Sequence, residues 1–61
     1  SYSGHAFDRM QDRGLTPSVI ENVIRPENIT NVRGGATRYF DPVNGIAAIV
    51  DNATGNVITV Y

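Results

Sequence analysis

The sequence predicts an α+β domain in which two N-terminal helices precede a four-stranded antiparallel β-meander. Two observations predict this order. Apolar residues recur with helical spacing up to residue 24, and after Asn28 they alternate with the period of two that is typical of strands. The connections between successive strands are short, which favours antiparallel pairing of neighbours. We therefore expect the helices to cover one face of the sheet.

The first expected helix spans residues 3–13. Its apolar arc on a helical projection consists of Ala6, Phe7, Met10 and Gly14. Ser3 suits the N-cap position, and Gly14 suits the left-handed residue that often closes a helix. The opposite arc is charged, so we expect an amphipathic helix whose apolar arc faces the core.

The second expected helix runs from about residue 17 to residue 24. Thr16 suits the N-cap, and Pro17 suits the first helical position, where its missing N–H costs nothing. The apolar stripe consists of Val19, Ile20, Val23 and Ile24. Arg25 precedes Pro26, and a residue before proline disfavours helical geometry, so the helix should end there.

Four strands are expected in the remainder: residues 29–33, 37–40, 46–51 and 56–61. They are separated by Gly34-Gly35 and by two longer segments rich in Asp, Asn and Gly, which favour turns. In the last strand, alternation puts Val57, Thr59 and Tyr61 on one face, and Ile58 and Val60 on the other. We expect Ile58 and Val60 to face the helices.

The composition limits the functional classes. A 61-residue chain is one domain at most, residues 1–61, and buries only about 60% of its unfolded surface. The absence of cysteine excludes a disulfide scaffold and a cysteine-ligated zinc finger. One histidine and six scattered carboxylates argue against a transition-metal site, so no metal and no cofactor is expected. Neither a membrane-spanning run nor a signal peptide is present in the sequence.

The two ends of the sequence suggest a larger parent protein. The chain begins at Ser1 without an initiator methionine, and it stops at Tyr61 within an apolar strand. We therefore expect residues 1–61 to be the C-terminal domain of a longer chain.

The charge distribution is more informative than the total. A net charge of −1 ordinarily argues against a nucleic-acid-binding domain. However, every basic residue is an arginine in the first 38 positions: Arg9, Arg13, Arg25, Arg33 and Arg38. The planar guanidinium suits phosphate and carboxylate better than an ammonium does. The sequence therefore predicts local anion binding rather than a broad basic surface.

The polar arc of the first helix is one candidate site. His5, Arg9 and Arg13 follow at intervals of four residues, so their side chains share one face. An imidazole can transfer a proton near neutral pH, and a neighbouring guanidinium can hold a phosphate. The alternative is a solvated helix face in which these arginines form ion pairs with the neighbouring aspartates.

The strands carry a second set of candidates. Thr37 and Tyr39 share one face of their strand, while Thr59 and Tyr61 are expected on the open face of the sheet. Their hydroxyls can donate to a phosphate, and tyrosine can stack on a base. The alternative is that threonine and tyrosine are simply good strand formers.

The glycine pair between the first two expected strands lies close to two arginines. Gly34-Gly35 can form an anion-binding nest beside Arg33 and Arg38. The alternative for such a pair is an ordinary turn.

Three segments together resemble a known group of proteins: the opening HAFDRMQDRG at residues 5–14, Thr37-Arg38-Tyr39, and the final VITVY at residues 57–61. The chain resembles the small nuclease toxin domains of the barnase, EndoU, colicin and RelE type. The similarity is greatest to those at the C-terminus of contact-dependent growth inhibition proteins and related polymorphic toxins. It covers nearly the whole chain, although family members are often longer.

The resemblance implies site roles in a cleft between the helices and the sheet. It implies that His5 is a general base or acid, that Arg9 stabilises charge on the scissile phosphate, and that Arg13 assists. The strand residues implied to complete the site are Thr37, Arg38, Tyr39, Thr59 and Tyr61, with Thr59 and Tyr61 catalytic and the others binding substrate. The general acid stays open among Tyr39, Tyr61 and His5. The absence of lysine departs from the colicin-like members, so the division of roles stays open as well.

The resemblance also implies a substrate and partners. It implies a metal-independent endoribonuclease that cuts RNA, typically tRNA, through attack of the ribose 2′-OH. Such a domain is part of a secreted or cell-surface effector, acts in the cytoplasm of a competing bacterium, and is blocked by a cognate immunity protein. We expect that inhibitor to be acidic. Whether a host protein activates the domain stays open.

Two other classes are weighed against this one. A non-enzymatic protein-interaction or antitoxin-like module would use the sheet edge or the apolar surface to recruit a partner. A DNA-binding helix-turn-helix is disfavoured, because the second expected helix is too apolar to read a groove.

Overall fold

The computed structural model describes all 61 residues. Its elements are α1 (Gly4–Arg13), α2 (Pro17–Val23), the short 3₁₀ helix η1 (Pro26–Asn28), β1 (Ile29–Arg33), β2 (Ala36–Asp41), β3 (Ile46–Asp51) and β4 (Val57–Val60). The predicted α+β class and element order are therefore confirmed, with η1 as an addition. No helix is long and apolar enough to cross a membrane.

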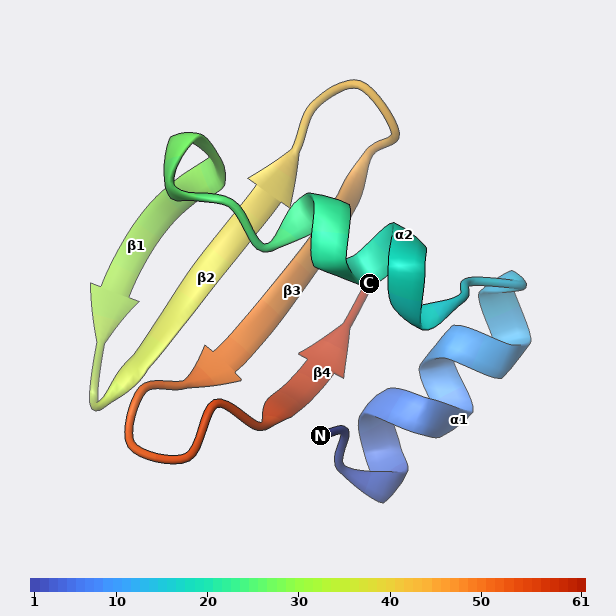
Figure 1. Ribbon diagram of the computed structural model, residues 1–61, viewed down its shortest axis with the longest axis horizontal. Coiled ribbons are helices and arrows are strands. Elements are labelled where there is room, and N and C mark those ends of the chain that lie inside the picture. The colour runs from blue at the N-terminus through green and yellow to red at the C-terminus, as the bar shows by residue number, and fades with distance from the viewer.

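The four strands form one sheet in the order β1-β2-β3-β4, with every neighbouring pair antiparallel (Figure 1). This is the predicted meander. α1 packs beside β4, whereas α2 packs against β2 and β3. Both helices contribute to one core on the same face of the sheet, which leaves the other face open.

The core forms where the two helices meet the inner face of β3 and β4. Its buried residues are Ala6, Met10, Ile20, Val23, Ile46, Ala48, Val50, Val57 and Val60. Alternation along β3 explains which of its residues join the core, because Ile46, Ala48 and Val50 point to the helices. Phe7, expected on the apolar arc of α1, is instead 52% exposed. Only a narrow arc around Ala6 and Met10 meets the sheet, since α1 lies at its β4 edge.

The helix ends follow the local signals in the sequence. The Ser3 hydroxyl accepts a 3.0 Å hydrogen bond from the Ala6 N–H, and Thr16 Oγ1 accepts one of 3.4 Å from the Val19 N–H. Gly14 closes α1 with a φ of 66°, in the left-handed region that favours glycine.

Two β-bulges alter the alternation that the sequence suggests. In β1, the register passes from Ile29↔Tyr39 directly to Asn31↔Arg38, so Thr30 is an extra residue. In β4, it passes from Thr59↔Ile49 to Val57↔Val50, so Ile58 is extra. The expected inward orientation of Ile58 and outward orientation of Val57 are therefore wrong. Ile58 is 40% exposed and Val57 is 4% exposed.

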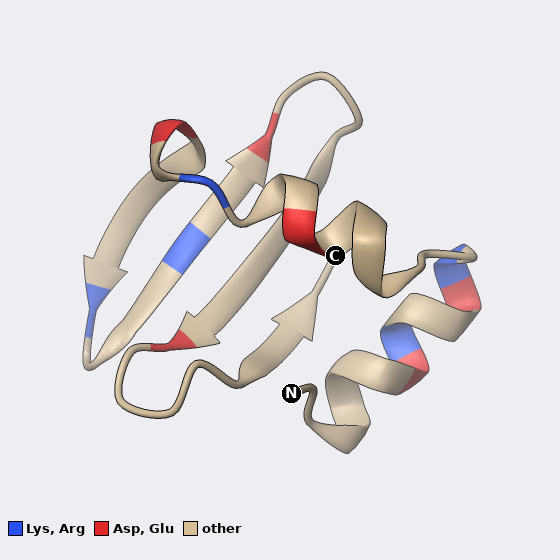
Figure 2. Ribbon diagram, in the orientation of Figure 1, with Lys and Arg blue, Asp and Glu red and all other residues tan.

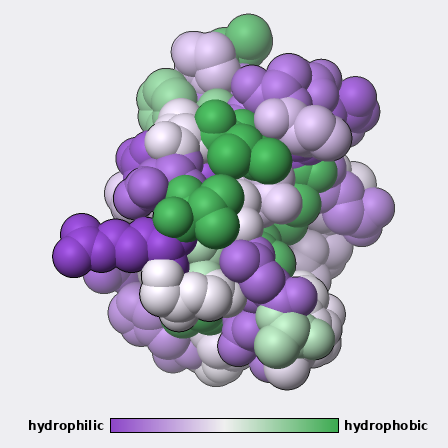
Figure 3. Space-filling model, turned by 90° about the vertical axis from the view of Figure 1, so that its left-hand side faces the viewer, coloured by the Kyte–Doolittle hydropathy of each residue, from purple (hydrophilic) through white to green (hydrophobic).

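The two sheet edges differ. At the β4 edge, the N-terminal segment pairs with the strand, since the Ser3 N–H donates to the Val57 carbonyl and the Val57 N–H donates to the Ser1 carbonyl. The β1 edge has no such neighbour. Its exposed apolar residues are Ile29 and Val32, and Figure 3, which views this side, shows hydrophobic atoms among hydrophilic ones.

Candidate functional site

The structure divides the predicted strand residues between the two faces of the sheet. Thr37 and Tyr39 lie on the face that the helices cover, where Thr37 is 6% exposed. Thr37 Oγ1 donates a 2.6 Å hydrogen bond to Asn52 Oδ1 of the β3–β4 loop, and Tyr39 packs against the core. These two residues therefore do not share a surface with Thr59 and Tyr61. The prediction that Thr37 and Tyr39 share one face of β2 is correct, but Arg38 and Phe40 occupy the open face.

Arg38 is the centre of the open face. Its Nε donates a 2.9 Å hydrogen bond to the Tyr61 hydroxyl, and its Nη1 donates a 3.0 Å hydrogen bond to Thr30 Oγ1. Its Cζ lies 5.6 Å from the centre of the Phe40 ring and 5.5 Å from that of Tyr61. Rings at these distances attract a cation through their π electrons. The guanidinium is therefore held by three neighbours from β1, β2 and the end of β4.

The partners of Arg38 leave its charge available. Tyr61, Thr30 and Phe40 are all uncharged, so none neutralises the guanidinium. A guanidinium has five N–H donors, and two of these are used within the protein. The other three, which include both donors on Nη2, remain for an anion.

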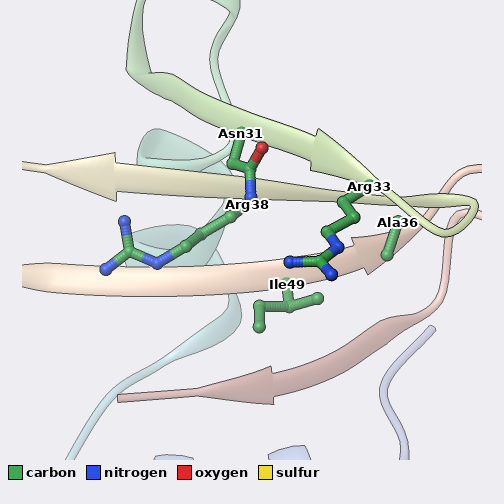
Figure 4. A pocket seen from close by; sticks show the side chains of 5 residues that line it. All are labelled: Asn31, Arg33, Ala36, Arg38 and Ile49. Carbon is green, nitrogen blue, oxygen red and sulfur yellow. The ribbon is translucent and has the colours of Figure 1, made fainter.

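A shallow open pocket of about 180 Å³ lies beside Arg38 on the same face. Its lining residues are Asn31, Arg33, Ala36, Arg38 and Ile49 (Figure 4). Figure 4 shows both guanidiniums extended over the sheet on the side of Ile49. Ala36, the register partner of Arg33, lies on the side of Arg33 away from Arg38 (Figure 4). The pocket is smaller than the 300 Å³ or more of a site for a drug-sized ligand, so it suits a single anionic group or part of a polymer.

Asn31 is a site residue that sequence reasoning missed, and Arg33 was noted only as a neighbour of the glycine pair. The register places Asn31 opposite Arg38 and Arg33 opposite Ala36. Alternation along β1 from Arg33 could have put both residues on the face of Arg38. The bulge at Thr30 has no clear signal in the sequence.

Thr59 lies on the open face in line with Arg38. Arg38 pairs with Ile49, and Ile49 pairs with Thr59, so the three residues form a row across β2, β3 and β4. Neighbouring strands lie about 4.8 Å apart, so Thr59 is about two strand spacings from Arg38. Thr59 and Tyr61 thus lie on the open face, as alternation predicted, and they bound the β4 side of the cluster.

The polar residues of α1, called here the α1 row, lack the tertiary contacts that hold Arg38. His5, Arg9 and Arg13 are all exposed on the outer side of α1. Figure 2 shows basic and acidic residues adjacent to one another along this helix. The start of α1 is tied to β4, because the Ser3 hydroxyl donates 2.6 Å to the Ile58 carbonyl. Because α1 packs on the covered side of the sheet, the structure does not bring His5, Arg9 and Arg13 together with Arg38 on the open face.

The structure brings no metal ligands together. Nowhere do three or more His, Asp or Glu side chains gather closely enough to hold an ion.

Comparison with known proteins identifies the family. A family model described as "Domain of unknown function (DUF4258)" matches residues 2–61. The chain is a member of the DUF4258 family. No curated protein and no solved structure matches it significantly. The description of the DUF4258 domain states no activity, so the resemblance to nuclease toxin domains stays a prediction.

Proposed function

We propose that this DUF4258 domain is a metal-independent endoribonuclease that binds RNA on the open face of its sheet. We further propose that its fold is of the barnase, EndoU, colicin and RelE type. The observation that carries the proposal is Arg38, an arginine held in place by uncharged neighbours on an uncovered face. Such a group binds a phosphate without first breaking an ion pair, and its position costs little reorganisation.

The neighbouring residues favour an unpaired RNA strand. Arg33 and Arg38 lie on adjacent strands, so they reach phosphates that are close together on one strand. Tyr61 is 43% exposed beside Arg38, and an exposed aromatic ring can stack on a base that is not paired. Because the overall charge is slightly negative, non-specific attraction to RNA is weak, and affinity depends on these local contacts.

In the proposed reaction a base removes the proton from the ribose 2′-OH, whose oxygen forms a new bond to phosphorus. The resemblance implies His5 for this step, whereas α1 packs on the side of the sheet opposite Arg38, so the role of His5 is the part of the mechanism that mutation must test. The bond from phosphorus to the 5′-oxygen breaks, and that oxygen takes a proton. Tyr61 is suited to donate this proton, because its oxygen accepts from Arg38 Nε and its own O–H remains free. Arg38 stabilises the charge on the phosphate during the reaction.

The biological role follows from the same proposal. An RNA-cutting domain of this size would serve as the toxic end of a larger effector, and an acidic immunity protein that covers Arg33 and Arg38 would block it.

The decisive test measures cleavage of a labelled unpaired RNA by the wild type and by Arg38→Ala, both with EDTA. We expect Arg38→Ala to lower the rate at least about 100-fold, the loss typical of a removed transition-state donor. Arg25→Ala is the matched control, since Arg25 lies between α2 and η1 and bonds to Asn22. Equal rates for Arg38→Ala and the wild type would overturn the site. Loss of wild-type activity in EDTA would overturn the metal-free mechanism.

A second candidate function is a protein-interaction module. The exposed β1 edge favours it, because Ile29 is 45% and Val32 60% exposed on a strand without an outer neighbour. A folded wild type that neither binds nor cuts RNA would favour this alternative.

A further inference from the structure

The bulge in β1 places two residues opposite Arg38 where a regular strand would place one. Asn31 is the register partner of Arg38, and the extra residue Thr30 lies directly before it. Ile29 still pairs with Tyr39 on the face that the helices cover. The bulge therefore adds Thr30 to the Arg38 side of the sheet without moving Ile29 away from the helix side. Bulges commonly redirect a side chain in this way next to functional sites.

Thr30 contacts Arg38 twice through one oxygen atom. Its hydroxyl donates a 3.2 Å hydrogen bond to the Arg38 carbonyl and accepts a 3.0 Å hydrogen bond from Arg38 Nη1. The hydroxyl proton and a lone pair are thus both used by the same residue. Tyr61, at the end of β4 on the same face of the sheet, holds the guanidinium through Nε. The side chain is fixed at two of its nitrogens while Nη2 remains free.

The chemical type of this support matters for an anion site. A carboxylate at position 30 would also hold the guanidinium, but it would neutralise the charge and compete with the phosphate. A hydroxyl orients the group and leaves its charge intact. Valine has nearly the same shape and strand preference as threonine but lacks the hydroxyl, so the two roles can be separated by mutation.

We propose that Thr30 is a positioning residue for Arg38, and that the β1 bulge serves to place it there. The inference rests on the proposed function only for the nature of the anion. Thr30 touches neither the phosphate nor the reacting atoms. It acts through the guanidinium, which it restrains before RNA arrives.

The test compares Thr30→Val and Thr30→Ser in two measurements. The first is binding of a labelled unpaired RNA made of 2′-deoxy nucleotides, which cannot be cut through the 2′-OH. We expect Thr30→Val to bind about tenfold more weakly and Thr30→Ser to bind within about twofold of the wild type, because hydrogen bonds to charged groups have effects of this size. Val32→Thr is the control on the same strand and should bind as the wild type does.

The second measurement needs no RNA. In the free protein, exchange of the Arg38 Nη protons with water, which include the proton that Thr30 accepts, is followed by NMR, with the peaks assigned by their loss in Arg38→Lys. We expect several-fold faster exchange in Thr30→Val, slow exchange again in Thr30→Ser, and no change at Arg25. A general loss of stability would instead change both arginines.

The outcomes separate the two proposals. If the wild type binds RNA and Thr30→Val binds equally well, the positioning role is overturned and the proposed function stands. If the wild type binds no RNA, the proposed function fails, and the exchange measurement alone decides the role of Thr30. Equal exchange at Arg38 in the wild type and in Thr30→Val would overturn the positioning role of Thr30.

Discussion

The two arginine clusters of this domain differ in how their side chains are held. On the open face, Arg38 is hydrogen-bonded to Thr30 and Tyr61 and lies against two aromatic rings. On α1, Arg9 and Arg13 share a face only because they are one helical turn apart, and they project outward among aspartates. Sequence spacing brings the second set together, whereas tertiary contacts fix the first. Of these arginines, only Arg38 is held by side-chain hydrogen bonds within the protein.

This difference suggests that the two clusters have separate roles, phosphate binding on the open face and proton transfer on α1. An ordered guanidinium loses little freedom when it binds phosphate, so the open face is suited to binding and charge stabilisation. The α1 row contributes the chain's one imidazole, which no open-face residue replaces. We therefore expect mutations on the two surfaces to affect different kinetic constants.

The largest expected effect is that of His5→Ala. If His5 takes the 2′-OH proton, kcat should fall about 100- to 10,000-fold, the range for a lost general base, while affinity for 2′-deoxy RNA should not change. Steady-state cleavage rates and fluorescence anisotropy measure the two quantities. Arg13→Ala, two turns along the same face, is the control and should change kcat only a few-fold. An unchanged kcat in His5→Ala would make α1 a solvated helix face without a catalytic role.

The next effect separates charge from orientation. Arg38→Lys keeps the charge but loses the planar fork that reaches both Tyr61 and Thr30. We expect RNA affinity to fall about 10- to 100-fold, as for the loss of hydrogen bonds to a charged group. Arg9→Lys on α1 should bind RNA within about twofold of the wild type. Similar losses in both variants would show that the two arginines are equally well positioned.

A smaller effect concerns the salt dependence of binding. Each phosphate contact contributes about 0.7 to the slope of log affinity against log salt for a single strand. Arg33→Ala and Arg38→Ala should each reduce the slope by about that amount, and Arg25→Ala should leave it unchanged. Titrations at four or more salt concentrations give the slopes. An unchanged slope in Arg33→Ala would show that RNA phosphates do not contact the pocket that Arg33 lines.

Local signals in the sequence predicted most of the fold. The caps at Ser3 and Thr16, the closing Gly14 and the change of period after Asn28 each act within a few residues, so a single chain reveals them. The bulges at Thr30 and Ile58 depend on the partner strand, so alternation alone mispredicted the faces of Val57 and Ile58. The site was hard to predict for the same reason, because tertiary packing decides which face of the sheet the helices cover.

The site residues show this limit most clearly. Alternation predicted Thr59 and Tyr61 on the open face, whereas Arg38 was a candidate through the glycine pair and the resemblance; the structure places all three on one face. The partnership of Arg38 with Thr30 spans two strands and requires the bulge, which no short pattern encodes. Thr37 and Tyr39 have the same residue types as Thr59 and Tyr61, yet they lie under the helices. Residue type alone therefore could not distinguish a surface hydroxyl from a buried one.

The smallest expected effect shows whether changes of activity with pH come from the site or from the fold. Asp41, which is 8% exposed, accepts hydrogen bonds from the Asn44 side chain and from the N–H groups of Val43 and Asn44. These bonds, led by that of the Asn44 side chain, hold the pKa of Asp41 below its ordinary value of 3.8. The unfolded chain binds this proton at a higher pH than the folded one does. The stability from Asp41 is therefore complete above the unfolded pKa and is lost as the pH falls through the folded pKa.

The contribution of Asp41 to the free energy of unfolding should therefore be constant between about pH 5 and 8. A change in cleavage rate over that range would then come from titration of the site and not from unfolding. Urea unfolding of the wild type and Asp41→Asn between about pH 2.5 and 7 tests this. The wild-type midpoint should fall below about pH 4, whereas Asp41→Asn should start lower at neutral pH and decline less on acidification. Parallel curves for the two proteins would show that Asp41 does not set the acid limit. The activity profile of the two clusters would then need correction for unfolding before their roles are compared.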